Sequence, residues 1–214
     1  MPDMLLLSDP EVADMPVRES HEPLVDMRTV SALRIDHRVA DARGAYAHVR
    51  ASVLDRLVSA QTLLPAHLRV LVVEGYRPRA LQTRYFSDYL ERLRLRWPDA
   101  DEAVLRQMTS RYVSPPDVAP HVAGAAVDLT LCTADGCELW MGTEVNDTEI
   151  PTCHTDSEEV EAGVRQRRLI LGRALRGAGF VNYPSEWWHW CYGDRYWACL
   201  TGVGHARYGP IETL

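Results

Sequence analysis

The segment from Ser185 to Trp190 constrains the fold of this 214-residue chain more than any other stretch. It reads Ser-Glu-Trp-Trp-His-Trp, so a carboxylate and an imidazole lie three residues apart among three tryptophans. The tryptophans exclude water, and exclusion of water raises the pKa of a carboxyl group such as Glu186. Taken alone, the segment also fits a plainer interpretation, in which the indoles pack in the core and the rim, Glu186 lies on the surface and His189 lies in the core.

A second stretch, residues 120–128, carries another imidazole and another carboxylate, His121 and Asp128. The step of seven residues between them is odd, so both side chains cannot lie on one face of a single straight strand. Gly124 allows the chain to bend between them, which leaves His121 before the strand and Asp128 within it. An unpaired carboxylate in the apolar run 127–131 would be costly, so Asp128 needs either a metal ion or backbone N–H groups at a sheet edge.

Together, His121, Asp128 and His189 can supply the two neutral nitrogens and the carboxylate oxygen of a catalytic zinc site. Such a site has three protein ligands and one position left open for water. The Trp-rich segment is typical of a strand, so Glu186 is expected to act from the turn that follows Pro184. Facing the open position, it would serve as the general base toward zinc-bound water and then as the acid toward the leaving amine.

Arg77 lies in a third stretch, Glu74-Gly75-Tyr76-Arg77-Pro78, directly after a nearly continuous apolar run. A guanidinium group held at such a junction can stabilise the oxyanion of an amide under attack, or bind a substrate carboxylate. A salt bridge between Arg77 and Glu74 explains the same spacing equally well.

Helices and strands are mixed along the chain, and hairpins come late. Apolar residues at helical spacing predict helices over 46–64, 78–97, 101–112 and 157–177. Apolar and β-branched runs predict strands over 67–74, 125–132, 137–141 and 180–183, and a final hairpin with arms over 187–192 and 195–200. This order favours an α+β fold with a mainly antiparallel central sheet flanked by helices.

The length fits a single domain spanning 1–214, on which residues 1–45, interrupted by prolines, pack as an irregular segment. The formal charge of −7 argues against a nucleic-acid partner, because no basic excess is available to neutralise phosphates. No apolar stretch is long enough to span a bilayer, and the first residues lack the basic flank of a signal peptide. We therefore expect no membrane partner and a cytoplasmic location.

The chain has five cysteines, an odd number, which together with the absence of an export signal favours reduced thiols. A structural zinc site built from Cys132, Cys137, Cys153 and His154 is a minor alternative, because the spacing is not that of a CxxC knuckle.

In combination, these motifs resemble the zinc D-alanyl-D-alanine dipeptidases, a family that includes the vancomycin-resistance dipeptidase and belongs to a superfamily with D,D-carboxypeptidases and the Hedgehog signalling domain. The resemblance implies a Hedgehog/D,D-peptidase-like fold and one Zn²⁺ per chain held by His121, Asp128 and His189. It also implies that Glu186 is the base and that Arg77 stabilises the transition state. The matching pieces, in one order across residues 46–192, are Glu74-Gly75-Tyr76-Arg77-Pro78, His121-x-x-Gly124-x-Ala126-x-Asp128-Leu129-Thr130-Leu131, Met141-Gly142 and Glu186-Trp187-Trp188-His189.

The chain departs from the family pattern at two places. Ala119 and Pro120 stand where the family usually has serine before its first zinc-binding histidine. After the Met-Gly pair, Asn146 takes the place of an aspartate suited to the substrate amine, and Asp147 follows it. Either the register shifts by one residue or recognition of the amine is altered. Asn146, Asp147 and Tyr76, the neighbour of Arg77, are therefore candidate substrate-binding residues.

The combined prediction is hydrolysis of D-alanyl-D-alanine or a related free dipeptide. One alternative is a D,D-carboxypeptidase or endopeptidase that acts on peptidoglycan fragments, against which the missing export signal counts. Another is a zinc-stabilised binding module without catalysis, against which the presence of both Glu186 and Arg77 counts, because a structural zinc site needs neither. The sequence leaves homo-oligomerisation open.

Overall fold

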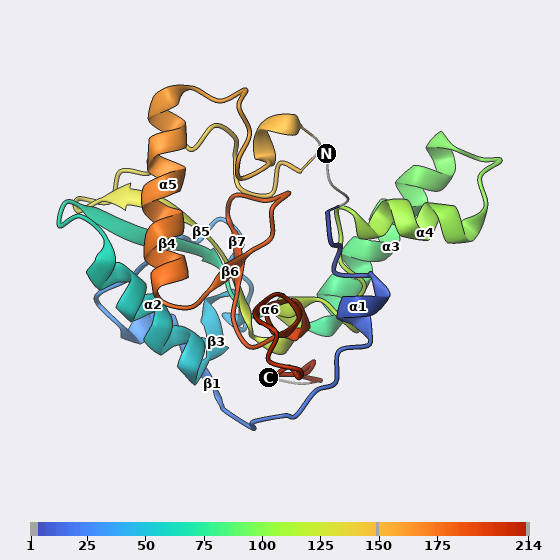
Figure 1. The fold of residues 1–214 in the computed structure, drawn as a ribbon, viewed down its shortest axis with the longest axis horizontal. Helices are drawn as coiled ribbons and strands as arrows, with labels where there is room; N and C mark the ends of the chain where they lie inside the picture. The colour runs from blue at the N-terminus through green and yellow to red at the C-terminus, as the bar shows by residue number, and fades with distance from the viewer. Residues whose placement is uncertain (1–3, 149, 213–214) are drawn as a thin grey trace.

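A five-stranded sheet lies at the centre of the protein in a computed structural model that describes residues 4–148 and 150–212 (Figure 1). Its order is β2-β4-β5-β7-β6. β2 runs parallel to β4, whereas the other three neighbouring pairs are antiparallel. The predicted α+β fold with a mainly antiparallel sheet is thus confirmed. The strands are β2 (Arg34–Ile35), β4 (Leu68–Glu74), β5 (Ala126–Thr133), β6 (Val181–Asn182) and β7 (His189–Cys191).

Two helices, α2 (Ala51–Leu63) and α5 (Ala162–Gly177), pack against each other and cover one face of the sheet (Figure 1). Their apolar sides meet alternate residues of the strands, because successive strand side chains point to opposite faces. Leu57 of α2, Leu129 of β5 and Leu171 of α5 are all buried in this main core. The opposite face of β4, β5 and β7 is left to carry polar side chains.

Strand register brings three polar residues into one row across the sheet. Val72 of β4 pairs with Leu129 of β5, but a bulge follows, and Glu74 then pairs with Asp128. Asp128 in turn pairs with His189 of β7. Directly paired residues point to the same face, so the bulge turns Glu74 onto the face that Asp128 uses. A one-residue irregularity in β4 thereby places the carboxylate of Glu74 beside Asp128 and His189 instead of in the core.

A pair of helices, α3 (Arg79–Arg96) and α4 (Glu102–Ser110), projects from the body as an arm (Figure 1). Both agree with the predicted helices over 78–97 and 101–112. The arm has its own small apolar cluster, separate from the main core. This cluster consists of Phe86, Tyr89, Leu90, Leu93 and Leu105.

From residue 4 onward, the N-terminal region is made of short pieces joined by loops. They are α1 (Pro10–Ala13), β1 (Leu24–Asp26) and η1 (Met27–Thr29), followed after β2 by η2 (Ala45–Ala47). β1 pairs with β3 (His48–Arg50) in a separate two-stranded sheet. Ahead of α1, Leu6 and Leu7 pack against Tyr183 and Tyr196, so this segment reaches the face that carries the polar row.

The prediction of a strand over 195–200 was wrong, because these residues form the helix α6 (Arg195–Thr201). The reason lies in the preceding residue. The side chain of Asp194 accepts hydrogen bonds from the backbone N–H groups of Tyr196 and Trp197 and so caps a helix start.

Other element boundaries also differ from the predicted ones. The helix predicted over 157–177 begins only at Ala162, and the one predicted over 46–64 begins at Ala51, after η2 and β3. The strand predicted over 137–141 reduces to a single bridge between Glu138 and Cys132. Among the described residues, none of the helices combines the length and the apolar character needed to span a bilayer.

Candidate metal centre and active site

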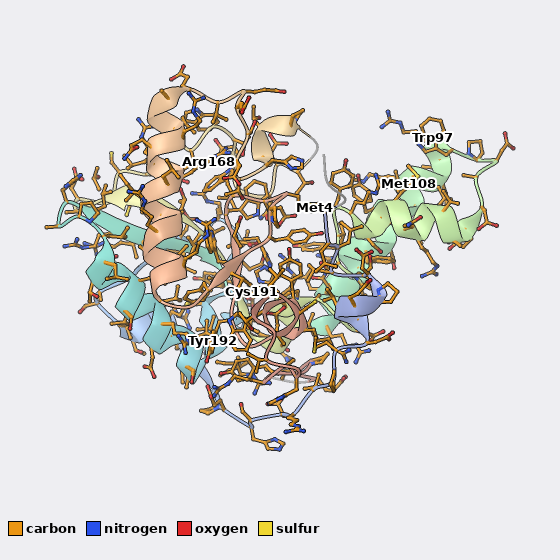
Figure 2. All side chains as sticks on the ribbon, viewed as in Figure 1. Met4, Trp97, Met108, Arg168, Cys191 and Tyr192 are labelled. Atoms are coloured by element: carbon orange, nitrogen blue, oxygen red, sulfur yellow. The ribbon has the colours of Figure 1, made fainter. Side chains whose placement is uncertain are left out.

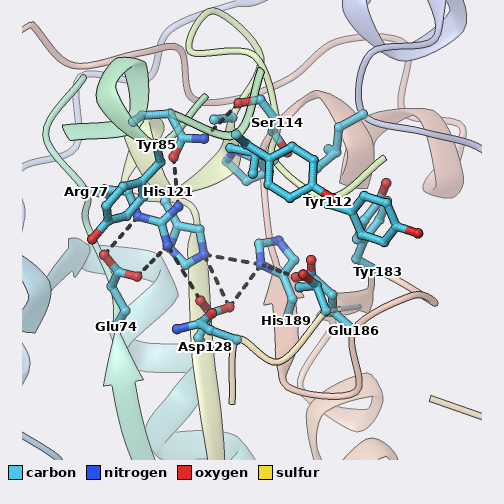
Figure 3. Close-up of a pocket in the computed structure, with 18 of the residues that line it drawn as sticks. Glu74, Arg77, Tyr85, Tyr112, Ser114, His121, Asp128, Tyr183, Glu186 and His189 are labelled. Atoms are coloured by element: carbon cyan, nitrogen blue, oxygen red, sulfur yellow. Dashed lines mark hydrogen bonds and ion pairs between the residues drawn. The ribbon is translucent and has the colours of Figure 1, made fainter. Parts of the chain in front are cut away.

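Three predicted ligands meet at the end of the sheet, although they come from separate segments (Figure 3). His121 lies on the short helix η3 (Pro120–Ala123), Asp128 on β5 and His189 on β7, and all three are buried. His189 Nδ1 lies 3.0 Å from Asp128 Oδ1 and 3.2 Å from His121 Nε2. His121 Nε2 lies 3.3 Å from Asp128 Oδ1. Three potential ligand atoms thus form a compact triangle.

The triangle has the size that a tetrahedral zinc ion requires. Bonds of about 2.0–2.1 Å at tetrahedral angles place neighbouring ligand atoms about 3.3 Å apart. The two imidazoles and one carboxylate also match the nitrogen and oxygen donors that zinc prefers, and no fourth protein ligand joins them within the described residues. The donor set therefore fits a divalent metal ion with one position left for another molecule.

Local backbone geometry delivers His121 to this triangle. Gly124 ends η3 with φ +65°, a left-handed conformation that glycine adopts readily, and the predicted bend is confirmed. A Cβ atom at Gly124 would lie 2.5 Å from Leu24 Cδ2, so a larger residue would require the Leu24 side chain to shift, in addition to adopting this positive φ. His121 Nδ1 donates a hydrogen bond of 2.7 Å to the carbonyl oxygen of Gly75, which leaves the Nε2 lone pair facing the triangle.

Asp128 is held in its ionised form. Its burial opposes ionisation, but the imidazoles of His121 and His189 outweigh this cost and keep the pKa of Asp128 well below its usual range. Arg77 adds a further positive charge, with Nη2 3.8 Å from Asp128 Oδ2. The site therefore presents an anionic ligand near neutral pH.

Glu186 stands at the edge of the triangle, in the turn before β7, as the sequence predicted. Its Oε2 lies 3.9 Å from His189 Nδ1, and its side chain is 14% exposed. The backbone N–H of Glu186 donates to the Tyr183 carbonyl, and Asn182 Nδ2 donates to the Glu186 carbonyl, so the turn is fixed. Burial raises the pKa of Glu186 to about 7, and nearby Asp128 acts in the same direction. A carboxyl group with such a pKa can both accept and return a proton near neutrality.

Arg77 satisfies both interpretations of its spacing. Its guanidinium group makes two hydrogen bonds to the carboxylate of Glu74, of which Nε to Oε1 measures 2.9 Å, and Nη1 donates to Gln82 Oε1 at 2.8 Å. The same group lies beside Asp128, on the opposite side of the triangle from Glu186 (Figure 3). Although burial opposes it, the charges of Glu74 and Asp128 raise the pKa of Arg77 above its usual value. The salt bridge therefore holds Arg77 in position at the site.

A cavity of about 710 Å³ opens over the triangle. Glu186, Arg77 and the three candidate ligands line it, and so do Asn146 and Asp147 at its exposed rim. Asn146 adopts φ +73°, in the left-handed region that asparagine tolerates better than most residues. Tyr76 does not line the cavity. Its ring is buried elsewhere, and its hydroxyl donates to the Ile211 carbonyl at 3.3 Å, so the geometry gives no support to Tyr76 as a substrate contact.

Sequence reasoning missed Arg168, a buried residue of α5 that faces the loop carrying the rim (Figure 2). It donates hydrogen bonds of 2.7–2.8 Å to three carbonyl oxygens of that loop and pairs with no carboxylate among the described residues. Burial lowers the pKa of Arg168 to about 10. No motif marks such a residue, because its role depends on where the loop passes. The acceptors belong to Met141, Thr152 and His154.

Several residues that line the cavity also escaped the sequence analysis as site residues. Tyr85 and Tyr89 belong to the apolar pattern that predicts the helix over 78–97, and such a pattern does not separate core from cavity wall. Among the polar lining residues that were missed are Glu74, Gln82, Tyr85, Asp88, Tyr89, Arg92, Arg111, Tyr112, Ser114 and Tyr183.

The second candidate zinc site is not assembled. Cys153, on η4 (Pro151–Cys153), and Cys132 are buried, Cys137 is exposed, and all three are free thiols. Within the described part of the chain, these cysteines and His154 form no metal-binding group.

Comparison with known proteins gives consistent matches. A family model described as D-ala-D-ala dipeptidase matches residues 20–200. The D-alanyl-D-alanine dipeptidase of Synechocystis sp. is 29% identical over 236 residues, covering 92% of this chain and 95% of that protein. That of Escherichia coli is 36% identical over 122 residues, covering 57% of this chain and 54% of that protein. The solved LD-carboxypeptidase LdcB shares the fold, with a TM-score of 0.50 and 15% identity over 96% of this chain and 88% of that one.

Proposed function

The chain belongs to the D-alanyl-D-alanine dipeptidase family, and from this membership we propose that it hydrolyses D-alanyl-D-alanine or a related free dipeptide with one bound zinc ion. The observation that carries the proposal is the triangle of His121, Asp128 and His189, with Glu186 and Arg77 on two sides of it. The relatives from Synechocystis sp. and Escherichia coli, which bear the dipeptidase name, support the choice of substrate.

Zinc, when bound, would supply a Lewis acid that polarises the amide carbonyl and makes water nucleophilic near neutral pH. The chain's own residues supply the rest. Asp128 contributes the negative charge of the ligand set, and the hydrogen bond from His121 to Gly75 fixes which imidazole nitrogen is available. Because all three side chains are buried, their orientation is set before any substrate arrives.

Glu186 is proposed as the general base. It takes a proton from the attacking water and passes it to the nitrogen of the leaving residue, so one carboxylate serves both steps. Two facts support the role: the carboxylate reaches the edge of the triangle, and its raised pKa of about 7 makes both transfers feasible near neutrality. The fixed turn limits its motion between the two transfers.

Arg77 is proposed to stabilise the oxyanion that develops on the carbonyl. Its side chain is only 12% exposed, and its guanidinium group is anchored by Glu74 and Gln82. Charge held in place in a site with little water costs no reorganisation during the reaction, which is why such groups lower barriers strongly.

The decisive experiment is Glu186→Ala with zinc content measured alongside turnover of D-alanyl-D-alanine. We expect zinc to stay bound, because the three candidate ligands are intact, and kcat/KM to fall by about 100-fold or more. Turnover that survives the change in a zinc-loaded variant would show that the assigned base is wrong. Turnover absent from the wild-type protein would refute the proposed substrate.

A non-catalytic zinc module would need a fourth protein ligand and has no use for an anchored arginine, so the same observations speak against it. Cytoplasmic location remains a prediction from the sequence, and metal analysis should show one zinc ion per chain.

A further inference from the structure

The cavity extends well beyond the metal triangle. Its volume of about 710 Å³ lies within the ~300–1,000 Å³ typical of sites for drug-sized ligands, whereas a dipeptide of two alanines is much smaller. The additional space lies against the arm. We call this part the outer chamber. It is lined by Tyr85, Asp88, Tyr89 and Arg92 of α3 and by residues 110–114, which begin with the last residue of α4.

One face of α3 is turned toward the outer chamber. Tyr85, Asp88, Tyr89 and Arg92 are spaced by three, one and three residues, so they share a side of the helix. The guanidinium carbon of Arg92 lies 4.6 Å from the centre of the Tyr89 ring, and that ring lies 5.7 Å from the ring of Tyr112. Aromatic rings with a guanidinium group over one of them can hold a ligand by contact and by charge.

The chamber also holds positive charge that has no carboxylate partner. Within the described residues, neither Arg92 nor Arg111 takes part in an ion pair, although the chain carries a net charge of −7. Of the other arginines of the arm, Arg79, Arg94 and Arg106 are paired with acidic side chains. Within the described residues, Arg84 and Arg96 form no ion pair either, but they do not line the cavity. Asp88 lines the chamber too, but two guanidinium groups outnumber it. Arginine favours carboxylates, because its planar donors match the two carboxylate oxygens.

We propose that the outer chamber is a second substrate subsite, which binds a carboxylate that an acidic peptide carries beyond its scissile amide. This inference rests on the proposed function, since the scissile amide must lie at the metal triangle. The arm then selects the substrate while the triangle, Glu186 and Arg77 perform the reaction. Acidic peptides longer than two residues become the expected ligands, in addition to the free dipeptide.

The test compares two pairs of tripeptides, each containing D-alanyl-D-alanine. One pair is lengthened at the amino end and the other at the carboxyl end, and the members of a pair differ only in Glu against Gln. Affinities are measured by calorimetric titration in a zinc-loaded Glu186→Gln background, which leaves the peptides intact. We expect the Glu peptide of at least one pair to bind about tenfold more tightly than its Gln partner, as a charge-assisted contact implies.

Variants of the arm decide where the preference arises. Arg92→Gln combined with Arg111→Gln is expected to bring the Glu/Gln ratio to about one. Arg96→Gln, on the same helix but outside the cavity lining, should keep the tenfold ratio. A ratio near one for both pairs with the arm unchanged, or a tenfold ratio that survives loss of both arginines, overturns the proposal.

The outcome separates this inference from the proposed function. If the wild-type protein does not cleave D-alanyl-D-alanine but the ratio depends on Arg92 and Arg111, only the proposed reaction is wrong. If the wild-type protein cleaves the dipeptide and the ratio is near one, only the subsite is wrong.

Discussion

Two arginine–glutamate pairs with the same three-residue spacing show how differently the floor of the cavity and the arm are built. Arg77 and Glu74 are 12% and 6% exposed, and they lie beside Asp128 at the floor. Arg94 and Glu91 are 43% and 58% exposed on α3. The first pair exists because a bulge in β4 turns Glu74 to the polar face, whereas the second needs only one helix. The same spacing thus holds a buried arginine in position at the cavity floor, whereas on the arm it gives an ion pair exposed to solvent.

The comparison teaches that context, and not the pair itself, determines what an ion pair contributes. An exposed pair gains little, since water screens it and two long side chains must be ordered. A buried pair contributes little net stability either, but breaking it leaves a charge without a partner. At the cavity floor, that charge is the Arg77 guanidinium group, which is proposed to face the reacting carbonyl. Disturbing this pair should therefore lower kcat/KM more than it lowers stability.

The largest expected effect on catalysis distinguishes Arg77 from Arg94. Arg77→Lys should lower kcat/KM by about 100- to 1,000-fold, because lysine cannot keep the forked bonds to Glu74 and Gln82 while facing the oxyanion. Zinc content should stay at the wild-type level. Arg94→Lys is the matched control, and steady-state kinetics should find it unchanged. Equal losses in the two variants would contradict the assignment.

A second prediction concerns the free energy of unfolding of the metal-free protein. The pKa of Glu186 is about 7 when folded and near 4.5 when unfolded, so the folded state binds more protons between these values and loses stability as pH rises through them. Metal-free Glu186→Gln should therefore be more stable than the metal-free wild type above pH 7, by up to about 3 kcal/mol.

The difference should vanish below about pH 4, where Glu186 is neutral in both states. Urea unfolding at pH 4 and pH 8 measures it. A stability difference that does not change with pH would show that burial does not raise the pKa of Glu186.

An intermediate effect is expected from the rim loop. Arg168→Met removes the donor shared by three loop carbonyls, so the loop that carries Asn146 and Asp147 should lose its fixed position. We expect KM for D-alanyl-D-alanine to rise about tenfold with kcat and zinc content little changed. Arg173→Met, an exposed change on the same helix, is the control. A fall in kcat with unchanged KM would place the role of Arg168 elsewhere.

The smallest effect is expected on the arm. Arg94→Gln removes exposed ion pairs to Glu91 and Glu102, and the melting temperature should stay the same within error. Thermal scans at low and high salt provide the check. A clear loss of melting temperature would mean that the arm depends on its surface charges more than on its apolar cluster.

Much of the floor could be predicted from the sequence, because its residues lie in motifs with local causes. The apolar run of β4 predicted a buried strand, and Gly124 predicted the bend that separates His121 from Asp128. The position of Glu186 ahead of a strand followed from Pro184 and the tryptophans. Each of these depends on a few neighbouring residues, which one sequence can reveal.

The remaining parts depend on contacts between distant segments. Nothing near Arg168 indicates that a loop passes within reach of its guanidinium group. The bulge that aligns Glu74 with Asp128 becomes visible only when two strands pair. The hairpin predicted over 187–200 places Asp194 in its turn, because a helix cap and a hairpin turn use the same residue types. The face of α3 that lines the cavity has the same periodicity as a face buried in a core.

The hydrogen bond from His121 to the Gly75 carbonyl has a consequence for engineering. The acceptor belongs to the main chain, so exchanging a side chain other than His121 itself removes neither of the two hydrogen-bonding groups. What can fail is the closeness of the segments, since a methyl group at Gly75 would come within 2.5 Å of the His48 carbonyl oxygen. A library of variants around the metal site would therefore find the proton position of His121 insensitive to most exchanges of neighbouring side chains but sensitive to substitution at Gly75, which has no side chain.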